Sequence, residues 1–285
     1  MSDLLAGNVI LAAGLTVATQ AIQIGAYSAR YAGIVTGCVA TAISLFSLLV
    51  TASRLAALFQ VPALGSLADR TANAALDAHR KTVSPEALAL FDHQMRIVVA
   101  ANTVGVLLGA LMLPLFLAMF VRGIGAFERL RSVPRALLRL LDWRVLRELV
   151  LATRVPSPSL LTRYPPRHLP AGLLIGNVIV TGIYAIGVVA ATYASVLDPG
   201  DARTAVLLSG IINGIATIAF TLVVDPNSAY ITDQAVKGER SVGEVKAMVI
   251  YLALTAVLGT LLSQLILYPS AVVIAFVAHL VNQLR

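Results

Sequence analysis

The sequence predicts an all-α polytopic membrane protein with about six transmembrane helices. Of its 285 residues, 58% are hydrophobic and 12% are charged, whereas soluble domains carry about 25% charged residues. The mean hydropathy is +0.87. These values exclude a disordered chain, a coiled coil and an ordinary soluble domain. The high hydrophobic content comes from six apolar stretches, each long enough to cross a bilayer.

Each of these stretches is bounded by charged residues, Pro or Gly. The predicted spans are 4–26, 34–58, 97–121, 172–197, 205–224 and 248–267. Ser84-Pro85-Glu86 predicts a helix start before the third span, and Pro114 is expected either to kink that span or to be accommodated by a cavity. The apolar tail 270–284 is too short to span alone, so Pro269 either kinks the sixth helix or starts a short interfacial or re-entrant helix. A seventh span stays open.

Positive charge is concentrated in one connection between spans. Residues 122–170 contain ten Arg and three acidic residues, and this excess of seven equals the formal net charge of the whole chain, +7. Lys and Arg accumulate on the cytoplasmic side of membranes, so this connection is predicted to be cytoplasmic and the N-terminus to lie outside. Ser132-Val133-Pro134 and the leucines after it predict an interfacial helix. Capture of an anionic substrate by these Arg is the alternative.

The two halves of the chain share a short sequence pattern. Gly7-Asn8-Val9-Ile10 in the first span matches Gly176-Asn177-Val178-Ile179 in the fourth. Three spans in each half, 1–121 and 171–285, would place the halves in opposite orientation within one transmembrane domain. The sequence therefore predicts an inverted repeat, with a binding site near the midplane between its halves.

A polar stripe in the second span is the clearest candidate site. Ser44, Ser47, Thr51 and Arg54 recur at helical spacing in an otherwise apolar segment. Such a stripe is expected to face protein or water, because ionisable groups in hydrocarbon are costly. Arg54 either binds an anion, since its planar fork can bond two phosphate oxygens, or snorkels while the stripe bonds neighbouring helices.

Two other charges lie at span ends. Arg30 follows the first span and is either a boundary charge or an anion ligand. Asp225 follows the fifth span and is a helix-ending carboxylate, a partner for an Arg or a proton carrier. Neither role can be chosen from the sequence, because each residue stands alone in its segment.

Motifs for ATP hydrolysis and metal binding are missing from the sequence. It contains no Walker A motif and no HExxH or similar metal spacing, and its four His are scattered. Cys38 is the single cysteine, which excludes an intramolecular disulfide. We therefore expect no ATP, cofactor or metal site, and movement or binding of an anion in the membrane rather than chemistry on a covalent bond.

Two blocks of the sequence match the pattern of a known family. The first block comprises Tyr27-Ser28-Ala29-Arg30-Tyr31-Ala32-Gly33, Ser53-Arg54 and Gln60-Val61-Pro62-Ala63-Leu64-Gly65. The second comprises Val224-Asp225-Pro226, Thr232-Asp233-Gln234 and Gly259-Thr260-Leu261-Leu262-Ser263-Gln264. Both blocks resemble the Amj family of lipid II flippases, the alternates to MurJ. The basic connection 122–170 does not take part in this resemblance.

The resemblance implies a transporter, not an enzyme, in the bacterial inner membrane. Its substrate would be undecaprenyl-pyrophosphate-linked disaccharide-pentapeptide, lipid II. The expected substrate-binding residues are Arg54, Arg30, Ser47, Thr51, Gln60 and Gln264. The candidates for gating or ion coupling are Asp225, Asp233 and Asp69.

Other functions stay open at this level. The chain could export another polyprenyl-linked glycan or a small amphiphile, or it could be a membrane-embedded polyprenyl-pyrophosphate phosphatase. A non-transporting scaffold would fill the Arg54 stripe with packed side chains and leave no cavity. Gly210 and Gly214 have a spacing that permits close helix contact, so a homodimer is a further expectation.

Overall fold

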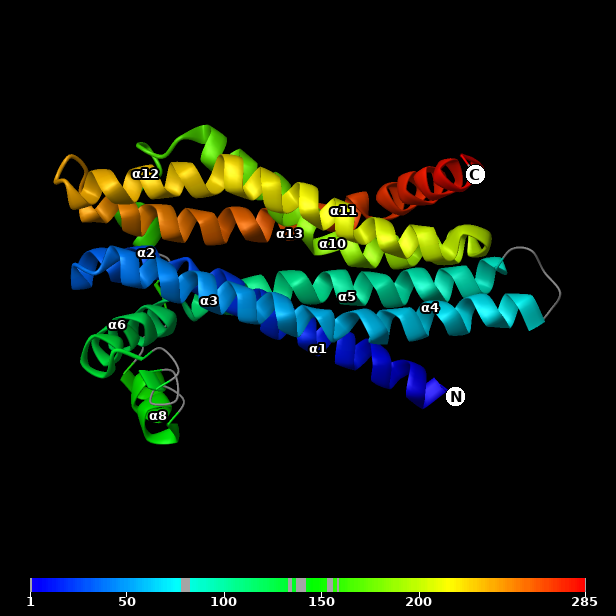
Figure 1. The fold of residues 1–285 in the computed structure, drawn as a ribbon, viewed down its shortest axis with the longest axis horizontal. Helices are drawn as coiled ribbons and strands as arrows, with labels where there is room; N and C mark the ends of the chain where they lie inside the picture. Colours follow the sequence, from blue (N-terminus) through cyan, green and yellow to red (C-terminus); the bar gives the residue numbers. More distant parts are fainter. Residues whose placement is uncertain are drawn as a thin grey trace.

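The computed structural model describes residues 2–77, 83–132, 135–136, 142–152, 156–157 and 159–284, and these are almost entirely helical. The helices are α1 (Ser2–Ala26), α2 (Ser28–Thr36), α3 (Val39–Leu58), α4 (Gln60–Asp77), α5 (Pro85–Leu111), α6 (Leu113–Leu130), α8 (Trp143–Ala152), α9 (Ser159–Arg163), α10 (Ala171–Leu197), η1 (Pro199–Asp201), α11 (Ala202–Ala219), the π-helix η2 (Phe220–Val224), α12 (Asp225–Val236) and α13 (Val242–Gln283). They form an elongated bundle (Figure 1).

Six helical segments are long and apolar enough to cross a membrane, within the part of the chain that the structure describes. They are Gly7–Thr36, Val39–Asn73, Pro85–Leu111, Ala171–Leu197, Pro199–Val236 and Val242–Gln283. This confirms the predicted all-α polytopic class and the number of spans.

Several helices extend beyond the predicted span ends. Gln60–Asp77 follows the end of the second predicted span and is helix α4, which continues α3. Asp225–Val236 follows the end of the fifth predicted span and is helix α12, which continues α11 through η2. Helix α13 runs through Pro269 to Gln283, so the apolar tail prolongs the sixth helix and forms no separate span. Its C-terminal part turns away from the line of its first part (Figure 1), as a proline-induced kink does.

The third span differs most from its prediction. Helix α5 begins at Pro85, where the Ser84 hydroxyl accepts a hydrogen bond from the Ala87 amide at 3.3 Å, and ends at Leu111. Met112 leaves the helical conformation, with φ −87° and ψ 0°, and Pro114 opens the next helix, α6. Proline is tolerated in a first helical turn because its missing N–H has no intrahelical partner there. The predicted kink at Pro114 is therefore a break between two helices.

Close backbone contacts hold the inner helices together. Helix α5 packs against α1 through Gly105, where an added Cβ would lie 2.6 Å from the Val17 carbonyl oxygen. Helix α13 packs against α10 through Gly259, where an added Cβ would lie 2.5 Å from the Val178 carbonyl oxygen. Small residues favour such approaches between membrane helices, where no hydrophobic effect drives association. In each predicted half, the first helix packs most extensively on the third.

The bundle has two distinct ends. Both termini lie at one end, and the α2–α3 and α12–α13 turns lie at the other, near α6 and α8 (Figure 1). The basic connection departs from this second end, so positive-inside reasoning predicts that it faces the cytoplasm. The inverted repeat stays a prediction, as does the homodimer. Among the described residues, nothing lies within 4 Å of a Cβ added at Gly210 or Gly214, and the open space at Gly214 belongs to a cavity inside the bundle.

Part of the basic connection lies beside the bundle. Helix α8 contacts α6, where Arg122 Nη1 is 3.6 Å from Glu148 Oε2. Trp143 and Leu151 on α8 are 74% and 75% exposed, which suits an interfacial helix. The predicted helix start at 133–134 and the leucines at 137–141 lie outside the described residues.

Replacing Gly259 with Ala should destabilise the protein by about 1–3 kcal/mol, because the added methyl group would press on backbone atoms of α10. Thermal unfolding of the detergent-purified protein measures this. The matched control is Gly65→Ala in α4, where an added Cβ meets nothing within 4 Å. That substitution should be neutral or stabilising by up to about 1 kcal/mol. Equal effects of the two variants would contradict the close packing.

Cys38 offers a test of orientation without any added cysteine. It lies in the α2–α3 turn and should react with a membrane-impermeant maleimide in inside-out vesicles but not in intact cells. Its thiol donates a hydrogen bond to Glu128 Oε1 at 2.9 Å, and this contact raises the pKa of the Cys38 thiol. Labelling should therefore be slow at neutral pH and faster as the pH rises, since the thiolate is the nucleophile. Glu128→Gln should accelerate labelling at neutral pH. Labelling of Cys38 in intact cells would contradict the predicted orientation.

Candidate functional site

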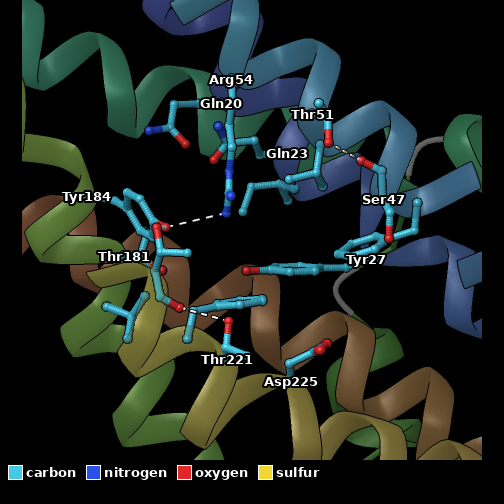
Figure 2. A pocket seen from close by; sticks show the side chains of 16 residues that line it. Gln20, Gln23, Tyr27, Ser47, Thr51, Arg54, Thr181, Tyr184, Thr221 and Asp225 are labelled. Carbon is cyan, nitrogen blue, oxygen red and sulfur yellow. Dashed lines mark hydrogen bonds between the residues drawn. The ribbon is translucent and has the colours of Figure 1, made fainter. Parts of the chain in front are cut away.

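A polar cavity lies inside the bundle toward the α2–α3 turn. It has a volume of 230 Å³ and is enclosed by α1, α3, α10 and the α11–η2–α12 segment (Figure 2). We call it the α2-side chamber. Its polar lining residues are Gln20, Gln23, Tyr27, Ser47, Thr51, Arg54, Thr181, Tyr184, Thr217, Thr221 and Asp225. Such a lining is unusual within membrane-spanning helices and indicates a hydrated, functional space.

A second polar cavity continues from the first toward the other end of the bundle. It has a volume of 310 Å³ and extends past Thr16 on α1, Gln60 at the start of α4, Asn102 on α5 and Asn213 on α11. We call it the α4-side chamber. The two chambers share five lining residues, Gln20, Gln23, Arg54, Tyr184 and Thr217. They therefore meet at the level of Arg54.

Helical periodicity directs these side chains inward. On α3, Ser47, Thr51 and Arg54 follow one another at spacings of four and three, and all three line the α2-side chamber. On the fifth span, Thr217 and Thr221 continue at a spacing of four to Asp225. Exposed apolar residues lie beside both stripes, for example Leu55 on α3 and Leu222 beside Thr221. Each helix therefore presents polar residues to the chambers and exposed apolar residues next to them.

Arg54 extends from α3 into the α2-side chamber (Figure 2). Its Nη2 donates a hydrogen bond of 3.4 Å to the Tyr184 hydroxyl, and its guanidinium carbon lies 5.9 Å from the centroid of the Tyr184 ring. No carboxylate pairs with Arg54 among the described residues. A positive charge thus faces the chamber without an anionic partner, and a phosphate is a suitable ligand for it.

Arg30 and Asp225 form an ion pair beside the same chamber. Arg30 is 7% exposed, and its Nη2 donates to Asp225 Oδ1. The Arg30 Nη1 atom is buried and has no hydrogen-bond partner among the described residues. Its guanidinium carbon also lies 6.0 Å from the Phe46 ring centroid. Because the side chain of Asp225 is 44% exposed and lines the chamber, this pair connects a buried cation to the cavity.

The α2-side chamber is bordered by two helices that pack little on each other, within the described residues. Helices α3 and α11 lie on opposite sides of it, and each packs on inner helices rather than extensively on the other, within the described ranges. Their outer surfaces expose large apolar side chains such as Leu48 and Ile218. The chamber therefore lies between two helices that make little contact with each other and expose apolar side chains, among the described residues.

Three potential metal ligands gather at the other end of the bundle. Asp198, Asp201 and His279 place ligand atoms within 4.8 Å of one another. His279 Nδ1 lies 2.9 Å from Asp201 Oδ2, and Asn282 donates to Asp201 Oδ1 at 2.5 Å. These contacts attach η1 to the end of α13 and account for the cluster without an ion.

Comparison with known proteins gives a consistent answer over most of the chain. Residues 15–278 match the family model described as Amj, alternate to MurJ. The chain belongs to the Amj family. A Bacillus subtilis (strain 168) protein named lipid II flippase Amj is 35% identical over 261 residues, which cover 90% of this chain and 91% of that relative. No solved structure gives a significant match.

The fold brings together most of the residues expected to bind substrate in this Amj protein. Ser47, Thr51 and Arg54 line the α2-side chamber, and Gln60 lines the α4-side chamber. Arg30 reaches the α2-side chamber through Asp225. These positions support the site that the sequence predicts without testing it.

Three candidates lie apart from the chambers. Gln264 on α13 donates to the Arg96 carbonyl at 3.0 Å, while Arg96 donates to the Gln264 carbonyl at 3.1 Å. This exchange joins α5 to α13, so Gln264 acts in helix packing. Asp69 and Asp233 are exposed on α4 and α12 and line neither chamber.

Tyr184 is the main site residue that sequence reasoning missed. It lines both chambers and contacts Arg54 directly. A signal was present, because Asn177, Thr181 and Tyr184 follow one another at spacings of four and three on α10. The stripe from Asn213 to Asp225 on the fifth span has the same periodicity. Both stripes are hard to recognise in the sequence because small and apolar residues occupy the positions between their members.

Replacing Asp225 with Ala should lower stability by about 3 kcal/mol in this Amj protein. That is the low end for breaking a buried ion pair, since Asp225 is partly exposed while Arg30 would be left buried and unpaired. Thermal unfolding in detergent measures the loss. The double variant Arg30→Met, Asp225→Ala should recover most of it, because it removes both charges together. A double variant as unstable as the single one would argue against the pairing.

Proposed function

We propose that this protein is a lipid II flippase of the bacterial cytoplasmic membrane. The observation that carries the proposal is Arg54, a cation without a carboxylate partner among the described residues, facing a polar chamber inside a six-span bundle. Membership of the Amj family and the similarity to a protein named lipid II flippase Amj support it. The protein would transport and not cleave its substrate.

The pyrophosphate is the part of lipid II whose negative charge most needs compensation inside the membrane. A charged group at the bilayer centre costs several kcal/mol unless it is paired or hydrated. Arg54 offers a fork of donors in the α2-side chamber, and the unpartnered Nη1 of Arg30 offers a further donor beside it. The two guanidiniums would hold the pyrophosphate while it moves between the leaflets.

The rest of the substrate divides between chamber and lipid. Sugar hydroxyls and peptide amides need hydrogen-bond partners, and the Gln and Thr side chains of both chambers provide them. The undecaprenyl tail would stay in the bilayer and pass between α3 and α11. The chambers, at 230 and 310 Å³, lie near the lower limit of small-ligand sites, about 300 Å³. Transport of the whole headgroup therefore requires these helices to move apart.

The path of transport follows from the predicted orientation. The α2-side chamber is lined by Tyr27, directly before α2, and by Asp225 at the start of α12, and α2 and α12 lie toward the end of the bundle that carries α6 and α8 (Figure 1). That end is predicted to be cytoplasmic. Lipid II would enter from that side and leave through the α4-side chamber. Rocking of two inverted halves would alternate the access, with Asp225 as a gating or ion-coupling group.

Arg54→Ala should reduce lipid II flipping roughly 10–100-fold, because the net loss of one charge-assisted hydrogen bond of about 1.5–3 kcal/mol corresponds to a change of about that size. Arg54→Lys should retain an intermediate rate, since an ammonium supplies a charge without the fork. Flipping is measured in proteoliposomes with labelled lipid II. The matched control is Arg203→Ala, an exposed Arg at the start of α11 that lines neither chamber, and its rate should equal that of the wild type.

Normal flipping by stable, inserted Arg54→Ala protein would overturn the role of Arg54. The competing function, export of another polyprenyl-linked glycan or a small amphiphile, is tested with the same vesicles. Lipid II should raise the thermal stability of the purified protein, whereas a panel of amphiphilic drugs should not. Stabilisation by the drugs alone would favour the competing function.

A further inference from the structure

The two chambers meet at a single level of the bundle. The α2-side chamber reaches from Tyr27 to Arg54, and the α4-side chamber continues from Arg54 to Gln60. Arg54, Tyr184 and Thr217 line both. Anything that passes from one chamber to the other must pass these side chains.

Tyr184 connects the two helices on either side of this level. Its hydroxyl is hydrogen-bonded to Thr217 Oγ1 on α11, and it accepts the hydrogen bond from Arg54 on α3 at 3.4 Å. The Arg54 guanidinium also lies against its ring. Since α3 and α11 scarcely pack on each other within the described residues, this one side chain of α10 links them across the cavity.

The contact between Arg54 and Tyr184 is weak compared with what a phosphate offers. Its 3.4 Å length exceeds the usual 2.7–3.2 Å range of N–H···O bonds, about 2.9 Å on average. A guanidinium bonds phosphate oxygens at roughly 2.7–2.9 Å, often in pairs, and such bonds are about twice as strong as neutral ones. An anion in the α2-side chamber would therefore take Arg54 away from Tyr184.

We propose that Tyr184 is a positioning residue that holds Arg54 across the passage between the two chambers, and that a phosphate-bearing headgroup opens the passage by capturing Arg54. This inference rests on the proposed function, because it assumes an anionic substrate. The closed passage prevents leakage when no substrate is bound. Opening then requires the pyrophosphate itself, so the Tyr184 hydroxyl couples recognition to access.

The test measures access from the α2 side to a cysteine in the α4-side chamber. Val61→Cys in a Cys38→Ser background places one thiol there. The protein is studied in membrane vesicles of the orientation in which wild-type Cys38 reacts with external reagent. A membrane-impermeant methanethiosulfonate is added with and without inorganic pyrophosphate, and the rate of modification is followed. This measurement requires no lipid II.

Without pyrophosphate, Tyr184→Phe should accelerate the modification roughly two- to tenfold, the equivalent of one net hydrogen bond. Pyrophosphate should accelerate it in the protein that retains Tyr184 and have no further effect on Tyr184→Phe. Thr217→Val, which removes the other partner of the Tyr184 hydroxyl, should give an intermediate rate. The matched control, Tyr268→Phe on α13, lies outside both chambers and should change neither rate.

Two results would overturn the inference. One is a Tyr184→Phe rate and pyrophosphate response equal to those of the parent, with both proteins equally stable to heat. The other is an equal acceleration by Tyr268→Phe, which would indicate general loosening of the bundle. If access behaves as expected while the wild type fails to move lipid II, the proposed substrate is wrong and the role of Tyr184 stands.

Discussion

A guanidinium at the centre of a membrane helix costs about 2.5–3.5 kcal/mol on insertion scales, and this chain places one guanidinium, that of Arg54, in a polar chamber and a second, that of Arg30, beside it. Arg30 meets the cost by pairing with Asp225. Arg54 has no carboxylate partner among the described residues and depends on the polar chamber around it. The placement of polar stripes on α3 and on the fifth span follows from this constraint, because every group that faces the two cations must solvate charge.

The helices divide into two groups. Inner helices pack tightly on one another, and peripheral helices such as α3 and α11 are mostly exposed. Helices α1, α5, α10 and α13 approach one another through glycines, and half of the α10 span is buried. In the most apolar part of each span, 6% of the residues are buried in the span that contains α11 and 18% in the span that contains α3. Motion that admits a large headgroup would therefore involve the peripheral helices, since separating the inner helices would open contacts between backbones.

The same division suits an amphiphilic substrate. The chambers provide charge and hydrogen bonds, while the outer faces of α3 and α11 provide apolar surface to the lipid. A headgroup and its tail can thus move together without either entering the wrong environment. The π-helical turn η2 lies directly before Asp225, and such turns often occur at functional sites because they re-aim the residues that follow.

Composition and local periodicity are enough to predict the class, the number of spans and the Arg54 stripe. They underestimate the length of the helices, because hydropathy falls after Leu58 and Val224 although helical segments continue to Asn73 and Val236. Only the tertiary structure paired Arg30 with Asp225, 195 residues away. It also placed Gln264 in a packing contact and Tyr184 at the junction of the chambers, since the rotation of each helix depends on its neighbours.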